Sequence, residues 1–136
     1  MNKKILSILF MSLVFVLASG TASMQTADHG KILGSWELEI DADGEYYYLT
    51  MILQDIEGAL QGNVSEASGY FYDVPLKDIL FESNVLTLKF TSPTPPDGME
   101  RIIICKFEVG DDLLEGSLTI EEMGLTAFVT GKREKK

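Results

Sequence analysis

The sequence predicts an all-β protein that folds as an antiparallel up-and-down β-barrel of about eight strands. Short segments in which apolar and polar residues alternate follow one another from residue 35 to residue 133, with turn-forming residues between them. No segment of useful length has helical periodicity. An open meander of eight strands would leave two exposed edges, and closure into a barrel removes both of them. A β-sandwich is the alternative architecture.

The N-terminal residues have the pattern of a secretory signal peptide, which we assign to residues 1–22. A short basic start precedes a largely apolar run of 13 residues, 5–17, and small residues follow it. This run is shorter than the ~20 residues that span a bilayer, which argues against a membrane anchor. We therefore expect an exported protein, periplasmic or secreted, with a flexible segment at 23–33 and a barrel domain at 34–133.

The chain that remains is strongly acidic. Residues 1–22 contain two of the 11 basic side chains and none of the 21 acidic ones, so the rest has a formal charge of −12. Nucleic-acid binding needs a basic surface and is therefore not expected. An anionic membrane surface would repel this chain, so we expect no membrane insertion after the signal peptide is removed. The charge favours cationic partners but identifies no protein partner.

The first three expected strands are joined by short turns. Apolar residues occupy every second position of the first strand, 35–41, and acidic residues alternate with them. The sequence Asp-Ala-Asp-Gly at 41–44 supplies turn chemistry before the second strand, 46–54, which is rich in aromatic and branched residues. A turn at 55–58 leads to a third strand around 60–64.

The next two strands follow a long aromatic loop at 66–73. The fourth expected strand, 74–82, contains a shift of its apolar phase, which predicts a β-bulge near Lys77 and Asp78. After a tight turn, apolar and polar residues alternate again in the fifth strand, 86–91.

Three more strands complete the barrel. The proline-rich segment 92–99 is expected to be a loop that cannot continue strand pairing. The sixth strand covers 100–109, the seventh 113–120 and the eighth 125–133, with short turns between them.

The inward positions of these strands give the expected core. It consists of Trp36, Leu38, Ile40, Leu49, Met51, Leu53, Leu60, Val64, Leu76, Phe81, Leu86, Leu88, Phe90, Ile103, Cys105, Phe107, Leu114 and Leu118. The phase of the second strand is open, because Tyr46, Tyr48 and Ile52 compete with its odd-numbered apolar positions. Cys105 is the only cysteine and lies in an apolar run, which predicts a buried free thiol.

Gly34 and Trp36 begin the first strand, and Arg133 ends the last one. This combination resembles the calycin superfamily of lipocalins, fatty-acid-binding proteins and avidins, and is most similar to small bacterial secreted lipocalin-like domains. Two further lipocalin motifs and the helix that follows the lipocalin barrel have no counterpart in this sequence. The resemblance implies a barrel whose interior often holds a small apolar molecule, and an arginine that packs across the tryptophan.

Strand counting separates two ends of the barrel. With eight antiparallel strands, the start of the first and the end of the last lie on one rim, so Trp36 and Arg133 meet there by counting alone. A guanidinium over an indole ring is a favourable cation–π contact. We therefore assign Gly34, Trp36 and Arg133 to a structural closed end.

The opposite rim, called the far rim below, is formed by the connections 42–44, 66–73, 92–99 and 121–124. It includes both long loops and many aromatic residues, and loops on a rigid scaffold commonly carry function. The candidate ligand-binding residues are Tyr46, Tyr48, Tyr70, Phe71, Tyr72 and Phe90. The alternative is that these aromatic side chains cap a filled barrel, since an eight-stranded barrel is just filled or holds one small ligand.

The sequence gives no catalytic or metal-binding pattern, so we expect neither an enzyme nor a cofactor. The only histidine, His29, precedes the first strand, and no Gly-x-Ser-x-Gly motif or zinc-type Cys/His spacing occurs. The acidic segment 41–45 lacks the 12-residue frame of a calcium loop. Many carboxylates on the far rim disfavour anionic ligands and suit neutral or cationic ones.

Two functions from different classes follow. The first is a carrier or sensor that holds a small, mostly apolar molecule inside the barrel. The second is a filled barrel that serves as a structural or protein-interaction module of the cell envelope.

Overall fold

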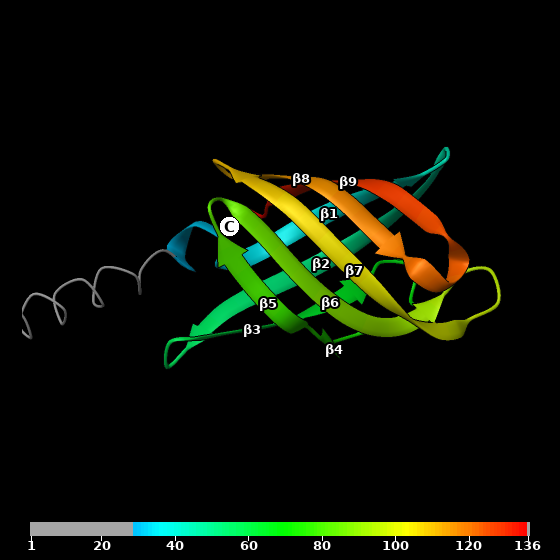
Figure 1. Cartoon of the computed structure of the whole chain (residues 1–136), viewed down its shortest axis with the longest axis horizontal. Helices are drawn as coiled ribbons and strands as arrows, with labels where there is room; N and C mark the ends of the chain where they lie inside the picture. The colour runs from blue at the N-terminus through cyan, green and yellow to red at the C-terminus, as the bar shows by residue number, and fades with distance from the viewer. Residues whose placement is uncertain (1–28, 136) are drawn as a thin grey trace, which may run out of the picture.

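Nine antiparallel strands form one sheet in the computed structural model, which describes residues 29–135 (Figure 1). The strands are β1 (Gly34–Ala42), β2 (Glu45–Ile56), β3 (Ala59–Glu66), β4 (Val74–Pro75), β5 (Lys77–Glu82), β6 (Val85–Thr94), β7 (Met99–Gly110), β8 (Leu113–Ile120) and β9 (Leu125–Arg133). Two short 3-10 helices are also present: η1 (His29–Lys31) precedes β1, and η2 (Glu121–Met123) lies between β8 and β9. The expected signal peptide lies outside the described residues. Within 29–135, no helix has the length and apolar character needed to cross a membrane.

The sheet curves into a nearly closed up-and-down barrel, as predicted. Its strand order is β4-β3-β2-β1-β9-β8-β7-β6-β5, so strands that are consecutive in sequence pair with each other, except β4 and β5, and β1 also pairs with β9. The seam lies between β4 and β5, which are separated in sequence only by Leu76. The backbone N–H of Leu76 donates to the Gly62 carbonyl at 2.9 Å, which attaches this connecting residue to β3.

The predicted fourth strand is divided in the structure. Leu76 interrupts it, and β4 and β5 take its two halves. The predicted bulge is confirmed, because the pairing of β5 with β6 shifts register between Lys77 and Leu80 and Asp78 has a φ of 52°. The strand changes partner here: β4 pairs with β3 and β5 pairs with β6.

The prediction that the proline-rich segment 92–99 is a loop is wrong for most of its length. β6 runs on to Thr94, β7 begins at Met99, and Pro93 pairs with Glu100 within the ladder. Proline is compatible with a strand where its nitrogen faces an edge without a partner. β5 pairs with β6 only as far as Lys89, so this part of β6 has such an edge. Only a four-residue turn remains of the expected loop.

The core follows the predicted alternation closely. All predicted core residues are buried except Leu60 and Phe81, which are partly buried and pack against the others. Leu60 lies on β3 beyond the short β4, and Phe81 lies on β5 at the seam, so neither has a further strand on that side. The odd-numbered positions of β2 are inward, so Tyr46 and Tyr48 face outward.

Two inward glycines mark places where strand backbones pass close together. A Cβ atom on Gly62 would overlap the Ile52 carbonyl oxygen, and one on Gly116 would overlap the Lys106 carbonyl oxygen. The barrel wall therefore requires the absence of a side chain at both positions, which permits strong local bending.

The closed end is built around Trp36, whose side chain is fully buried. The Arg133 guanidinium lies 4.3 Å from the centroid of the Trp36 ring, and the two residues are direct partners in the β1–β9 ladder. Arg133 also donates to the carbonyl of Leu33, to the carbonyl of Lys31 at 2.6 Å and to Asp112 at 2.7 Å. The contact predicted between these two residues is thus present in the structure.

Residues 29–33, assigned above to a flexible segment at 23–33, take part in this end. Ile32 is fully buried, and its carbonyl accepts a hydrogen bond of 2.9 Å from Trp36 Nε1. His29 Nδ1 lies 2.7 Å from Asp55 Oδ2 near the end of β2. The segment from His29 onward therefore plugs the barrel; residues 23–28 lie outside the described part of the chain.

Replacement of Trp36 by Ala is expected to reduce the free energy of unfolding by about 3–5 kcal/mol, because it empties the closed end and removes the platform beneath Arg133. Thermal and urea unfolding measure the effect. Tyr72→Ala is the control, since Tyr72 is 70% exposed on a loop and should change stability by much less. Equal losses in the two variants would contradict the assigned closed end.

Replacement of Gly116 by Ala is expected to destabilise the barrel by about 1–3 kcal/mol, because the added methyl group must displace the backbone of β7. Gly30→Ala is the matched control, since a Cβ atom there meets nothing within 4 Å. Urea unfolding of both variants tests this, and a Gly116 variant as stable as the Gly30 variant would contradict it.

Candidate functional site

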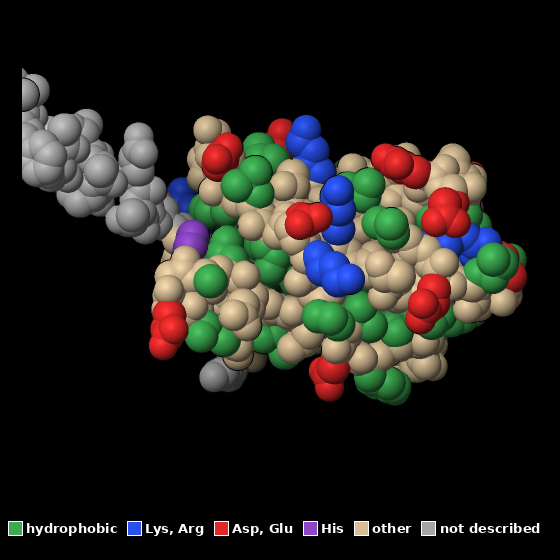
Figure 2. All heavy atoms as spheres, turned by 60° about the horizontal axis from the view of Figure 1, so that its bottom comes forward, with side chains coloured by type: hydrophobic (Ala, Val, Ile, Leu, Met, Phe, Trp, Pro, Cys, Tyr) green, Lys and Arg blue, Asp and Glu red, His purple; other side chains and the backbone are tan. Residues whose placement is uncertain are grey.

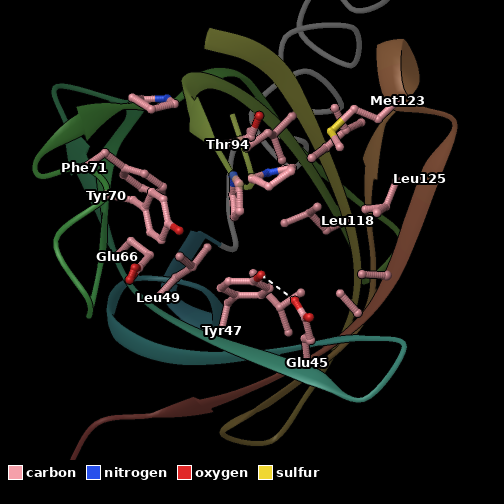
Figure 3. A pocket seen from close by; sticks show the side chains of 18 of the residues that line it. Glu45, Tyr47, Leu49, Glu66, Tyr70, Phe71, Thr94, Leu118, Met123 and Leu125 are labelled. Carbon is pink, nitrogen blue, oxygen red and sulfur yellow. Dashed lines mark hydrogen bonds between the residues drawn. The ribbon is translucent and has the colours of Figure 1, made fainter. Parts of the chain in front are cut away.

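A cavity of about 330 Å³ lies inside the barrel at the far rim (Figure 3). All four connections of that rim, or the strand ends beside them, contribute to its lining. The lining residues are Ile40, Ala42, Glu45, Tyr47, Leu49, Glu66, Tyr70, Phe71, Phe90, Pro93, Thr94, Pro95, Pro96, Ile103, Leu118, Ile120, Met123, Leu125 and Ala127. Most of this surface is apolar.

The cavity exists because side-chain size differs between the two ends of the barrel. Trp36 and Phe107 are both fully buried toward the closed end, and no residue of that end lines the cavity. Toward the far rim, β1 and β9 instead present the small residues Ala42 and Ala127. One end of the interior is therefore filled by large side chains, and the other end is left hollow.

One wall of the cavity carries hydroxyl and carboxylate groups from β2 (Figure 3). The Tyr47 hydroxyl donates a hydrogen bond of 2.9 Å to the Glu45 carboxylate. This hydrogen bond is the main cause that raises the pKa of Tyr47 above its ordinary value, because loss of the proton would break the bond and place two negative charges together. Burial and the nearby Glu66 and Tyr70 act in the same direction.

Glu66 at the end of β3 adds a buried carboxylate, with only 4% of the residue exposed. Both of its carboxylate oxygens accept from the Ser68 backbone N–H, Oε2 at 3.0 Å. The backbone N–H of Glu66 bonds to the Phe71 carbonyl at 3.0 Å, and that of Ala67 to the Tyr48 carbonyl at 2.9 Å. The loop that presents Tyr70 and Phe71 is thus fixed by its own hydrogen bonds, and Figure 3 shows the Tyr70 hydroxyl pointing into the cavity.

The β6–β7 turn forms the opposite lip. Arg101 donates two hydrogen bonds to the Asp97 carboxylate, at 2.8 and 2.7 Å, and one to Thr94 Oγ1 at 2.6 Å. The Arg101 guanidinium holds the pKa of Asp97 well below its usual range, since it favours the ionised carboxylate. Thr94 Oγ1 in turn donates to the Met99 carbonyl at 3.1 Å. These contacts fix the turn and neutralise the Arg101 charge.

The structure brings together only half of the residues predicted for ligand binding. Tyr70, Phe71 and Phe90 line the cavity, and the Phe71 and Phe90 ring centroids are 5.9 Å apart. Tyr46 and Tyr48 do not line it, because β2 presents its odd-numbered positions inward and leaves these side chains 52% and 53% exposed on the outer face.

One further predicted residue lies elsewhere, and several lining residues, Glu45 and Glu66 among them, were not predicted as ligand-binding. Tyr72 projects from the loop, is 70% exposed and does not line the cavity. Tyr47 lines it but was not among the candidates. The signal for Tyr47 was available, since it shares the odd phase of Leu49 and Met51, both of which were placed in the core.

The arrangement suits non-covalent binding. Within residues 29–135, no group of three or more His, Cys, Asp or Glu side chains is placed to hold a metal ion. Burial raises the pKa of the Cys105 thiol to about 12, so this thiol stays protonated at neutral pH. The polar groups of the cavity are carboxylates and hydroxyls that already have hydrogen-bond partners or face the open space.

Replacement of Glu45 by Gln is expected to lower the pKa of Tyr47, because the neutral amide no longer repels a phenolate. The titration of the Tyr47 ring, followed by NMR at alkaline pH, measures this change. In the unsubstituted protein the ring should titrate above its ordinary pH range. An unchanged Tyr47 titration would contradict the Glu45 contact.

Comparisons of the chain with known protein families, with curated proteins and with solved structures give no match. The functional argument therefore depends on the geometry of the cavity alone.

Proposed function

We propose that this protein is an exported, non-enzymatic, lipocalin-like binding protein that holds a small, mostly apolar, neutral or cationic molecule in the cavity at its far rim. The observation that carries the proposal is the cavity itself, about 330 Å³ in volume and lined mostly by apolar side chains. This volume falls within the range of roughly 300–1,000 Å³ typical of small-molecule sites.

The distribution of rigid and hollow regions supports this proposal. The closed end is well packed, so the cavity does not come from a loose interior. The hydrogen bonds of the 66–71 loop and of the β6–β7 turn hold both lips in place through contacts within the protein. A preformed site needs little reordering on binding, which favours affinity.

The second candidate function is a structural or protein-interaction module. The observation that favours it is a set of exposed aromatic side chains near the far rim, including Tyr46 and Phe128, which are 52% and 57% exposed. Both residues pair with Asp41, which lies between them and interrupts an apolar surface with a carboxylate. A continuous apolar patch is the usual mark of a protein interface, so the cavity provides the stronger argument.

The binding proposal is tested by filling the cavity. N-phenylnaphthylamine, an uncharged probe that fluoresces in apolar sites, should bind the unsubstituted protein. Ala127→Phe places a ring inside the cavity and should weaken this binding at least about tenfold, provided that the variant remains folded. Thr126→Phe is the matched control, because it adds the same ring to the exposed outer face of the same strand.

Three outcomes separate the two functions. Loss of binding in the Ala127 variant alone supports a binding site inside the barrel. Equal probe binding by all three proteins would mean that the probe sits on the outer surface, and it would contradict the proposal. No binding by any of them would favour the interaction module. Native mass spectrometry of the protein purified from its own host would reveal a retained natural ligand.

A further inference from the structure

The charged groups of the cavity are all of one sign. Glu45 and Glu66 are the ionisable acids among its described lining residues, and no Lys, Arg or His lines it. Arg101 lies close by, but two hydrogen bonds to Asp97 already neutralise its charge. The outer face in Figure 2, by contrast, mixes acidic with basic side chains. The charged side chains that line the cavity are therefore carboxylates without a basic partner among the lining residues.

Aromatic side chains accompany these carboxylates. Tyr47 lies between Glu45 and Glu66 in the view of Figure 3, and Tyr70 and Phe71 come from the loop that follows Glu66. Aromatic faces attract cations through their negative π-electron density, and groups of such rings recognise organic ammonium ions. Carboxylates beside the rings add a full negative charge to the same wall. The combination suits a cationic nitrogen attached to an apolar body.

The buried position of Glu66 favours a cation over an uncharged ligand. Its carboxylate has one protein donor, the Ser68 N–H, and retains unused acceptor capacity. An uncharged apolar ligand would remove the remaining water from this carboxylate and offer no compensating donor, which costs free energy. An ammonium group would provide both the donor and the opposite charge. An anion would be repelled by both carboxylates.

We propose that the cavity selects an organic ammonium ion, whose apolar body lies among the aliphatic side chains of β7, β8 and β9 and whose nitrogen lies against Glu45, Tyr47 and Glu66. This inference rests on the binding function proposed above and names its ligand class. Tyr70 closes the same wall with its hydroxyl. The ligand is defined by one positive charge at one end and an apolar remainder that fits about 330 Å³.

Three probes with the same ring system and different charge test the inference. Naphthylmethylamine is cationic at neutral pH, naphthalenemethanol is uncharged and naphthoate is anionic. Isothermal titration calorimetry at low ionic strength should give an affinity for the amine about tenfold higher than for the alcohol, because its hydrogen bonds are charge-assisted. Naphthoate should bind more weakly than the alcohol.

Variants that remove single charges assign the preference to the lining carboxylates. Glu66→Gln and Glu45→Gln should each reduce the preference for the amine, and the double variant should bring it within about threefold of the alcohol. Binding of the alcohol should change little. Asp43→Asn is the control, because it removes the same charge from the same rim at a residue that does not line the cavity. Asn tolerates the φ of 56° found at this turn position.

Each result supports or overturns the inference. A preference for the amine that is lost with Glu45 and Glu66 but kept in the Asp43 variant supports it. Equal binding of amine and alcohol overturns it and leaves the proposed binding function intact. An equal loss of preference in the Asp43 variant overturns the assignment to the cavity wall. Failure of N-phenylnaphthylamine and of all three probes to bind overturns the proposed function as well. Glu45 is exposed, so its variant stays informative if the Glu66 variant does not fold.

Discussion

The pairing of β1 with β9 is the constraint on which the rest of the molecule depends. It turns a meander into a barrel, and its register places Trp36 opposite Arg133 and Leu38 opposite Gly131. Because side chains alternate across a strand, a slip by one residue would turn Trp36 outward and Glu37 inward. The cation–π contact and the bonds from Arg133 to the chain before β1 fix this register at the end where the ladder begins. The same register then determines which side chains reach the far rim.

The hollow part of the barrel is a property of this sequence rather than of the architecture. A barrel of this size lies near the limit between an interior filled by side chains and one that holds a small ligand. The size of the residue at each inward position therefore decides whether a given level is filled. Trp36 and Phe107 fill the closed end, whereas Ala42 and Ala127 leave space at the far rim. The well-packed level and the level that contains the cavity are consequently different parts of one structure.

Most of the fold could be predicted from the sequence, because the alternation of apolar residues has the same period as a strand. It gave the strand positions, the inward residues and the bulge beside Asp78. Local rules failed where tertiary context decides. Pro93 is compatible with β6 because β5 does not extend to it. Ile32 is buried because it covers Trp36, and its carbonyl accepts a hydrogen bond from Trp36 Nε1. Neither fact is visible in the local pattern.

The sequence predicted the location of the candidate site correctly, but only half of the predicted residues line it. Counting strands identified the far rim, since the parity of an up-and-down barrel assigns every loop to one end. Tyr46 and Tyr48 of β2 were predicted to bind ligand because they are aromatic residues near the far rim. The pleat of the strand instead turns both side chains outward. Tyr47 faces inward and its neighbours on both sides face outward. Loop residues have no such period. The sequence pattern therefore could not show that Tyr70 and Phe71 face the cavity while Tyr72 does not, because the hydrogen bonds of the loop determine this.

The net charge of the chain and the carboxylates of the cavity act over different distances. The formal charge of −10 creates a field that salt screens over roughly 8–10 Å, so it affects mainly how fast a cation reaches the far rim. Glu66 acts at contact distance from a region with little water, where its field is screened much less. Added salt should therefore slow the association of a cationic ligand more than it weakens the bound state. In the proposed binding, the acidic surface and the buried carboxylate would for this reason make separable contributions.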